Sequence, residues 1–443
     1  MGDSALNRAP VEIWERILLE VISRITTPIF ETSCTPSNYL AFKRTCGDGD
    51  TIVYQHEYKE SERSRRALRR VCRAWRAIAD RWDNRERWIR VSALDKQISE
   101  ERWRGAQRVE FVSPSGMGIW NGNGTKAHET GGLRAVLFDW RLLGLPGGSG
   151  MRLRRLEMLH ITESGFGSVI QGLCGAASSL TCLRSLSLSV PTKSSSSLHA
   201  ISEHFHRLTH LTLRMTFTQK LTDFPDFDSD DELDSQSEDD GGRAASHILR
   251  FPKLEVLFLF PVRHCFDLTN WVLPVLRHVH VRPVGGIWGR TILPFLERHA
   301  STIETLDMDD VSTSAIPLYT SGLAETSNVD TDTLDFWDTF AHLKLLRCKI
   351  GRNGFSTYPD QHHAFECLVS ANPVVTADDF TAVLGPWVHD DRVKKLKSIV
   401  LFGPYMSRGA FTQKGPVRAI LQQLRWNGTR LLNPAGREWI DMP

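Results

Sequence analysis

The sequence predicts an α/β protein in which a small N-terminal helical module precedes a long repetitive region with a curved parallel sheet. Three observations lead to this prediction: two amphipathic stretches near the N-terminus, a series of similar short apolar segments beyond about residue 100, and regular spacing of those segments. The chain has 443 residues, which exceeds what one compact core normally holds. Two parts, or one long repetitive part, are therefore expected.

The first stretch, APVEIWERILLEVISRI, predicts a helix over residues 10–25. Pro10 suits its first turn. Apolar residues recur along it at three- and four-residue steps, namely Ile13, Trp14, Ile17, Leu18, Val21, Ile22 and Ile25. Glu12, Glu15, Arg16 and Glu20 are expected on the opposite face.

The second stretch, within residues 62–82, contains ALRRVCRAWRAIADRW and predicts another amphipathic helix. Arginines occupy the angles outside its apolar stripe, which consists of Leu68, Val71, Cys72, Trp75, Ile78, Ala79 and Trp82. Residues 27–61 between the two stretches contain many Pro, Gly, Ser, Thr and Asp residues without a sustained period. This segment is predicted to be a long loop.

Beyond about residue 100, short apolar segments of one shape recur, such as LTCLRSLSL and FPKLEVLFL. Each has an anchor followed by apolar residues three and five places later, and the anchors are Leu156, Leu183, Leu208, Leu254, Leu276, Ile303, Leu343 and Leu396. Weaker copies begin at Ala106 and Leu133. Most spacings fall between twenty and thirty residues, which is typical of leucine-rich repeats that each add one strand to a curved parallel sheet. An ordinary α/β domain with similar strands is the alternative.

Two further expectations follow from this repeat pattern. The acidic segment 222–243 is predicted to be a disordered insertion, because it contains too few apolar residues to bury. Strand residues between the anchors are expected to line the inner face of the sheet and to bind a protein substrate. They are His160, His210, Arg214, Phe258, Phe260, His278, His280, Arg282, Asp307, Asp309, Arg347 and Lys349.

The N-terminal stretches APVEIWERIL, LRRVCRAWRAIAD and RWIRV together resemble an F-box, and the chain resembles the fungal F-box proteins that carry a leucine-rich-repeat-like region. The resemblance implies an F-box-like module over 1–92 and an irregular leucine-rich-repeat-like solenoid over 93–443. Two features depart from the usual motif, namely Ala9 in place of leucine and the 27–61 insertion.

Such a protein is expected to be the substrate-recognition subunit of an SCF-type ubiquitin ligase. Its F-box would bind a Skp-type adaptor, and through it a cullin-RING ligase, while the repeats bind the substrate. The residues expected to bind the adaptor are Pro10, Ile13, Trp14, Ile17, Leu18, Leu68, Val71, Cys72, Trp75 and Ile78. No catalytic residue, cofactor or metal ion is expected, because adaptor subunits act by holding a substrate in place.

Other functions are weighed against this one. The sequence lacks a Walker A loop, a nucleophile elbow and an HExxH motif, so we expect no enzyme. Nucleic-acid binding through the Trp- and Arg-rich residues 59–108 is less favoured, since the tryptophans at 75 and 82 follow the apolar stripe. An interaction scaffold without a ligase role is the strongest alternative.

The composition also bears on partners and compartment. The formal net charge of +2 produces no strong field toward nucleic acid or an anionic membrane. No signal peptide or membrane-spanning run is recognised, and the eight cysteines include no CxxC pair. A cytoplasmic or nuclear location without a membrane partner is therefore expected.

Overall fold

The structure is a computed structural model. It describes residues 10–23, 33–46, 51–81, 88–92, 106–112, 153–158, 163–191, 195–216, 248–262, 268, 270–283, 292–312, 336–349, 364–374, 376–389, 396–402, 415–433 and 438. The predicted copy at Leu133, the acidic segment 222–243 and His160 lie outside these residues.

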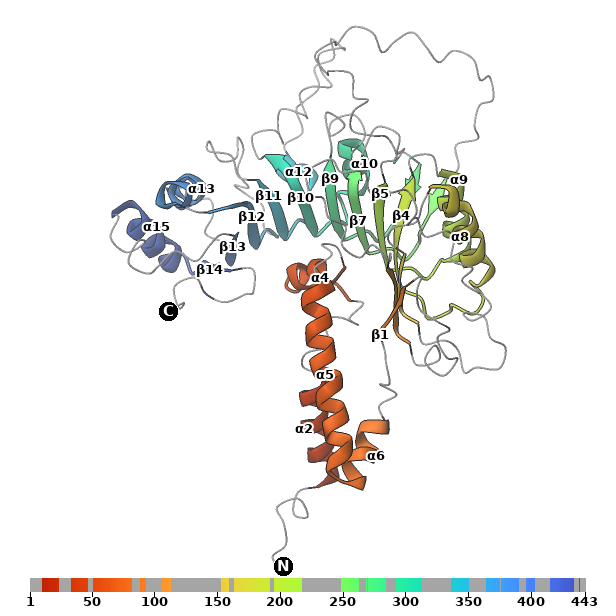
Figure 1. Cartoon of the computed structure of the whole chain (residues 1–443). Helices are drawn as coiled ribbons and strands as arrows, with labels where there is room; N and C mark the ends of the chain where they lie inside the picture. Colours follow the sequence, from red (N-terminus) through yellow and green to blue (C-terminus); the bar gives the residue numbers. More distant parts are fainter. Residues whose placement is uncertain are drawn as a thin grey trace, which may run out of the picture.

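A parallel sheet of 12 strands dominates the fold, and the strands lie side by side in the order of the chain (Figure 1). Strands β1 and β14 form its two edges, so the sheet is open. The strands are β1 (Trp88–Ser92), β2 (Arg108–Val112), β3 (Arg155–Met158), β4 (Ser185–Pro191), β5 (His210–Thr216), β7 (Val256–Val262), β9 (His278–Pro283), β10 (Thr305–Ser312), β11 (Leu345–Lys349), β12 (Cys367–Pro373), β13 (Ser398–Phe402) and β14 (Arg430–Leu432).

Helices between the strands cover one face of this sheet and form the main hydrophobic core with it. Leu186 and Leu188 of β4 pack in this core with Phe166 and Ile170 of a helix. These leucines alternate with residues that point to the other face, as strand geometry requires. The helices are α8 (Glu163–Gly175), α9 (Ser195–His204), α10 (Leu293–His299), α12 (Phe336–Thr339), α13 (Ala377–His389) and α15 (Gly415–Trp426).

The predicted anchors are buried and most of them directly precede a strand. Leu183, Leu208 and Leu254, for example, lie two residues before β4, β5 and β7. The anchor predicted at Leu156 is wrong by three residues, because the sheet register pairs Leu156 with Leu186 and thus makes Leu153 the equivalent of Leu183. The long interval after the anchor Leu343 leaves room for insertions or a further repeat, and strand β12 lies there with the buried Phe365 two residues before it.

Among its described residues, the N-terminal part has the helices α2 (Val11–Ser23), α4 (Tyr39–Cys46), α5 (Thr51–Val71) and α6 (Arg73–Arg81). The prediction of a loop over 27–61 is therefore wrong for 39–46 and 51–61. The predicted helix over 62–82 begins at Thr51 and breaks at Cys72. At this break, the Cys72 Sγ accepts a hydrogen bond from the Trp75 N–H at 3.4 Å and caps α6.

Helices α2, α5 and α6 form an arm that projects from the sheet, while α4 lies at the base of this arm against the sheet (Figure 1). Strand β1 begins at Trp88, so residues 88–92 belong to the sheet rather than to the predicted module 1–92. Within the described residues, the structure has no helix that combines the length and apolar character needed to cross a bilayer.

Candidate functional site

Two surfaces of the molecule contain the residues predicted to bind partners. The first is the far end of the arm, which we call the helical tip and which consists of α2, the last two turns of α5 (64–71) and α6. The second is the sheet face opposite to the main core, which we call the inner face. Both contain residues that the sequence predicts to bind partners. At the helical tip some of these residues are exposed, whereas at the centre of the inner face they are buried.

The helical tip has a small core of its own. Leu18 is only 2% exposed, and the rings of Trp14 and Trp75 lie 5.7 Å apart between α2 and α6. Leu68 is also half-buried. These four predicted adaptor-binding residues therefore contribute to the packing between the three helices.

Other predicted adaptor-binding residues at the helical tip face solvent. Ile13 is 49% exposed, Ile17 is 44% exposed and Val71 is 56% exposed. Pro10 and Cys72 are exposed as well. Because Ile13 and Ile17 are one helical turn apart, they form an apolar stripe on α2 that no described part of the chain covers.

Ile78 belongs to α6, but its side chain lies outside the described residues. The structure thus divides the predicted set into residues that build the tip and residues that it presents to solvent. The sequence pattern does not make this division, because both groups follow the same apolar stripe.

The inner face is covered at its centre by α4. The Phe42 ring lies 4.9 Å from the ring of His210 and 6.2 Å from that of Phe258. Tyr39 stacks on His278 with a centroid distance of 6.4 Å. Tyr39, Phe42 and Phe258 belong to a second hydrophobic cluster, which also contains Cys34.

A buried carboxylate ties α4 to the same face. The Tyr39 hydroxyl donates a hydrogen bond of 2.9 Å to Asp307 Oδ2, and Lys43 Nζ lies 2.9 Å from the same oxygen. Arg347 donates to Asp307 Oδ1 at 2.9 Å, and His280 Nδ1 lies 3.2 Å from Oδ2. Asp307 is completely buried, so its carboxylate joins α4 to three neighbouring strands out of contact with water.

The titration of these groups is set by burial and by their neighbours. Burial alone raises the pKa of Asp307, but His280, Lys43 and Arg347 outweigh it and hold the pKa well below its usual range. Burial and Asp307 raise the pKa of Tyr39, so its hydroxyl stays protonated and able to donate.

Two histidines beneath α4 are held in the neutral form. Burial is the main cause that lowers the pKa of His210 to about 3 and that of His278 to about 4. The charge of Arg155 also lowers the pKa of His210. Neither ring carries a charge near neutral pH, so neither offers a cation to an external partner.

This arrangement corrects part of the predicted substrate surface. His210, Phe258, Phe260, His278, His280 and Asp307 are all buried. Helix α4 packs on His210, Phe258 and His278 and bonds to Asp307. His280 lies against Phe260 and Asp307. The sequence predicted these side chains to be open to a protein partner. In the structure, a segment of the same chain occupies their position.

The remaining predicted substrate residues lie nearer the strand ends. Arg282 and Lys349 are exposed, whereas Arg214 and Arg347 are half-buried beside aromatic rings, with guanidinium carbons 5.2 Å from the centroids of Phe260 and Phe402, respectively. The side chain of Asp309 lies outside the described residues. A cationic and aromatic rim therefore borders α4.

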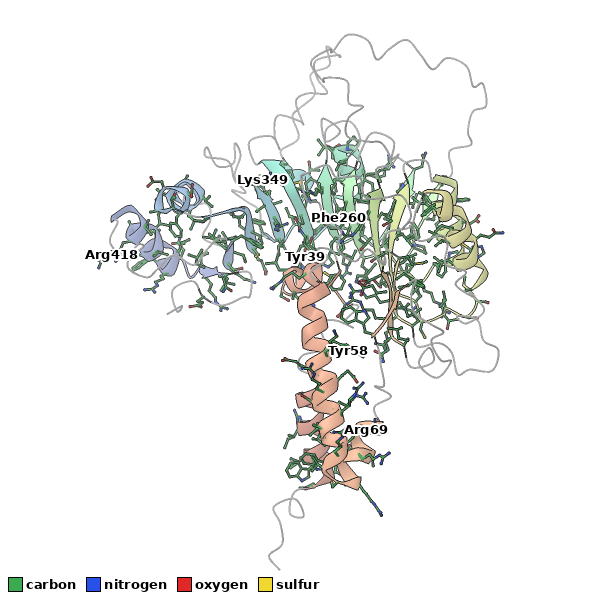
Figure 2. The ribbon with its side chains drawn as sticks, viewed as in Figure 1. Tyr39, Tyr58, Arg69, Phe260, Lys349 and Arg418 are labelled. Carbon is green, nitrogen blue, oxygen red and sulfur yellow. The ribbon has the colours of Figure 1, made fainter. Side chains whose placement is uncertain are left out.

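A second contact between the arm and the sheet involves Tyr58 of α5. Its ring lies 5.7 Å from that of Trp88, and its hydroxyl accepts a hydrogen bond of 3.4 Å from the Trp88 N–H. Trp88 is buried, and the guanidinium carbon of Arg108 lies 4.1 Å from its ring centroid. Figure 2 shows Tyr39 at the base of the arm, Tyr58 along it and Arg69 near the tip.

Sequence reasoning missed α4, although a local signal for it exists. In the segment Thr35–Asn38, the Thr35 Oγ1 accepts from the Asn38 N–H at 3.3 Å, and the Asn38 Oδ1 accepts from the Thr35 N–H at 2.8 Å. This reciprocal pair is a capping box with Asn in the place of Glu or Gln, and Pro36 suits the first turn. The sequence TPSN therefore marks a helix start.

Comparison of the chain with protein-family models and with curated proteins finds no match.

Proposed function

We propose that this protein is the substrate-recognition subunit of an SCF-type ubiquitin ligase. In this proposal, α2 with the end of α5 and α6 is an F-box-like module that binds a Skp-type adaptor and, through it, a cullin-RING ligase. The parallel sheet with its outer helices is an irregular leucine-rich-repeat-like solenoid that binds the protein to be ubiquitinated. The chain itself performs no chemistry.

The observation that carries the proposal is the exposed apolar stripe of Ile13 and Ile17 at the helical tip, with Val71 and Cys72 also exposed there. Each isoleucine leaves apolar surface in water, which a partner helix would cover at a gain of roughly 25 cal/mol per Å². The tip also lies at the end of an arm, where a partner meets no obstruction from the sheet (Figure 1).

The attachment of the arm supports the same function. A ubiquitin ligase must hold its substrate at a defined distance from the loaded enzyme, because effective concentration depends on that geometry. The Asp307 cluster holds α4 at the base of the arm against the sheet, and the Tyr58–Trp88 contact joins α5 of the arm to strand β1. A partner bound at the tip therefore keeps one orientation relative to the rim that borders α4.

Nucleic-acid binding has weaker support. Trp75 packs against Trp14, and Trp88 is buried beneath Arg108, so neither ring is free to stack on a base. Arg65 is buried and donates to Glu62 at 3.1 Å, which uses one arginine of the basic stretch internally.

The proposal is tested by capture of the purified full-length chain on an immobilised Skp-type adaptor. The chain is compared with Ile13→Asp, Ile17→Asp and the control Trp426→Asp, whose parent side chain is 87% exposed on α15 at the other end of the molecule. Capture should persist between about 0.1 and 1 M salt, since apolar contacts are screened little. The two tip variants should lose capture, and the control should retain it.

Failure of the folded full-length chain to bind would contradict the ligase role and favour an interaction scaffold. Capture that weakens steeply with salt, or that survives both tip substitutions, would also contradict the proposed apolar interface.

A further inference from the structure

Helix α5 of the arm has a local excess of positive charge. Between residues 58 and 71 it contains six basic and two acidic residues, whereas the whole chain has a formal net charge of only +2. Lys59, Arg63, Arg66 and Arg70 follow one another at steps of four, three and four residues. Residues at such steps lie on one side of a helix, so these four form a line, which we call the basic stripe.

The basic stripe is exposed along its whole length. None of its four residues makes an ion pair with an acidic side chain among the residues that the structure describes. Of the two acidic residues nearby, Glu62 accepts from Arg65 at 3.1 Å. Glu60 lies off the stripe, about 100° around the helix from Lys59. The stripe therefore presents its positive charge to solvent.

The other side of α5 is turned toward the rest of the arm. Ser61 and Arg65 are buried and Leu68 is half-buried, and helical spacing places all three away from the basic stripe. Figure 2 shows this part of α5 along the arm, between the labelled Tyr58 and Arg69. A partner can therefore lie along the stripe without displacing the residues that hold the arm together.

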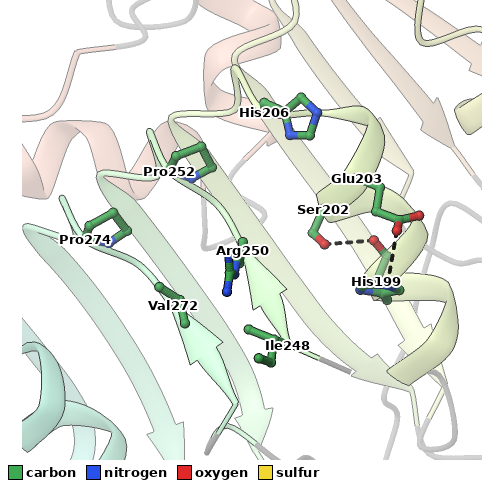
Figure 3. Close-up of a pocket in the computed structure, with 9 residues that line it drawn as sticks. All are labelled: His199, Ser202, Glu203, His206, Ile248, Arg250, Pro252, Val272 and Pro274. Carbon is green, nitrogen blue, oxygen red and sulfur yellow. Dashed lines mark hydrogen bonds and ion pairs between the residues drawn. The ribbon is translucent and has the colours of Figure 1, made fainter. Parts of the chain in front are cut away.

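The exposed Arg250 on the sheet has a different setting. It lines a groove of about 660 Å³ between α9 and a two-stranded sheet made of β6 (Leu249–Arg250) and β8 (Trp271–Val272). Glu203 of α9 belongs to the same lining and offsets its charge (Figure 3). The basic stripe has no such balance.

The spacing of the basic stripe favours a helical partner. From Lys59 to Arg70 the stripe is about 16 Å long, at 1.5 Å per residue. A second helix with carboxylates at the same steps has the same length, so each carboxylate can meet one cation. Alternate residues of an extended chain are about 6.6 Å apart, so four of them span about 20 Å and lose register with the stripe. Ala67, a small exposed residue beside the stripe, allows such a helix to approach closely.

We propose that the basic stripe binds an acidic amphipathic helix of a partner protein, whose carboxylates recur at steps of four and three residues. The arginines form charge-assisted hydrogen bonds with these carboxylates, for which the planar guanidinium allows a bidentate geometry. Nucleic acid fits less well, because Trp75 packs against Trp14 and offers no free ring to a base. The inference does not depend on the ubiquitin-ligase proposal, which uses the exposed isoleucines of α2.

The test uses the full-length chain and a fluorescein-labelled, alanine-rich helical peptide with glutamates at steps of four, three and four residues. Binding is measured by fluorescence polarisation at about 0.05 and 0.5 M salt. One control peptide has glutamine in place of glutamate, and another has the same glutamates distributed around the helix. A short RNA duplex is the nucleic-acid probe.

The protein variants reverse or keep the charge of two stripe residues. One combines Arg63→Glu with Arg70→Glu, and the other replaces the same two arginines by lysine. The matched control combines Arg418→Glu with Arg425→Glu, two exposed arginines that are also seven residues apart, on α15.

Saturable binding of the glutamate peptide below about 1 mM is expected at the lower salt, with about tenfold weaker binding at the higher salt. The glutamine peptide should not bind measurably, and the peptide with distributed glutamates should bind at least about threefold more weakly. The double reversal on α5 should weaken binding by about tenfold or more, while the α15 control should change it by less than about twofold. The lysine variant should bind within about threefold of the natural chain, because the charge remains.

The inference is overturned if no saturable binding occurs below about 1 mM peptide, or if the α15 control weakens binding as much as the double reversal on α5. Equal binding of the peptide with distributed glutamates would also overturn it. The same holds if the RNA duplex binds more tightly than the peptide and depends on the same two arginines.

Discussion

Replacing Asp307 by Asn should detach α4 from the inner face. The substitution nearly preserves the side-chain volume and leaves one oxygen that can accept from the Tyr39 hydroxyl, but it removes the charge and turns the oxygen that accepts from Arg347 into an NH2 donor. Lys43, which is 3% exposed, then lies buried beside a neutral group, and Arg347 loses its carboxylate partner. Removing one member of a buried ion pair costs about 3–5 kcal/mol.

The position of Cys34 provides a direct assay. Its thiol is buried in the cluster beneath α4, whereas Cys72 and Cys182 are exposed and serve as internal controls. Alkylation followed by mass spectrometry should show fast labelling of Cys34 in Asp307→Asn and slow labelling in the natural chain. The exposed cysteines should label at the same rate in both.

A double substitution isolates the ion pair itself. Lys43→Met removes the buried cation, so Asp307→Asn combined with Lys43→Met should be less destabilised than the sum of the two single variants. Urea unfolding measures each free energy. The reasoning is refuted if Asp307→Asn changes stability by less than about 1 kcal/mol and leaves Cys34 protected.

Three other predictions follow from the buried groups. The free energy of unfolding should fall as the pH decreases from about 6.5 to 4. His210 and His278 have folded pKa values of about 3 and about 4, so the unfolded chain binds more protons than the folded chain in this window. A thermal midpoint independent of pH in this range would contradict this prediction. Glu157→Gln should lower the free energy of unfolding, measured in urea, by about 3–5 kcal/mol, because Glu157 lies 3.0 Å from Arg108 and 2.7 Å from Arg155 in a buried cluster. An unchanged free energy of unfolding would show that the cluster is solvated. Phe42→Ala should cost about 3 kcal/mol and speed labelling of Cys34, since the Phe42 ring is 4% exposed; unchanged labelling would disprove its role in docking α4.

The sheet was accessible to sequence reasoning because its signal is local and repeated. Leu183, Leu186 and Leu188 show the pattern of an anchor and two strand residues that point into the main core, and similar triplets recur at most strands. The pattern predicts the wrong anchor at Leu156. Leu153, Leu156 and Leu159 are three residues apart, and only the pairing of β3 with β4 shows that Leu153 is the anchor. The pattern missed β12 because its anchor is Phe365 rather than an aliphatic residue.

The occupied inner face was not accessible in the same way. Tyr39 and Asp307 are separated by 268 residues in the chain, and no short-range period connects them. The capping sequence TPSN predicts that a helix starts near Thr35, but not where that helix docks. The division of the helical tip into a core and an exposed stripe likewise depends on how α2 packs against α5 and α6.

Hydrogen–deuterium exchange of the full-length chain, with and without a purified Skp-type adaptor, shows whether the helical tip is the adaptor-binding surface. We expect the adaptor to slow exchange in residues 10–23 and at the junction of α5 and α6 around Cys72. Residues 33–46, which already lie against the sheet, should exchange at the same rate in both states. Unchanged exchange at the helical tip, or protection confined to the sheet, would contradict the proposal that this tip is the adaptor-binding surface.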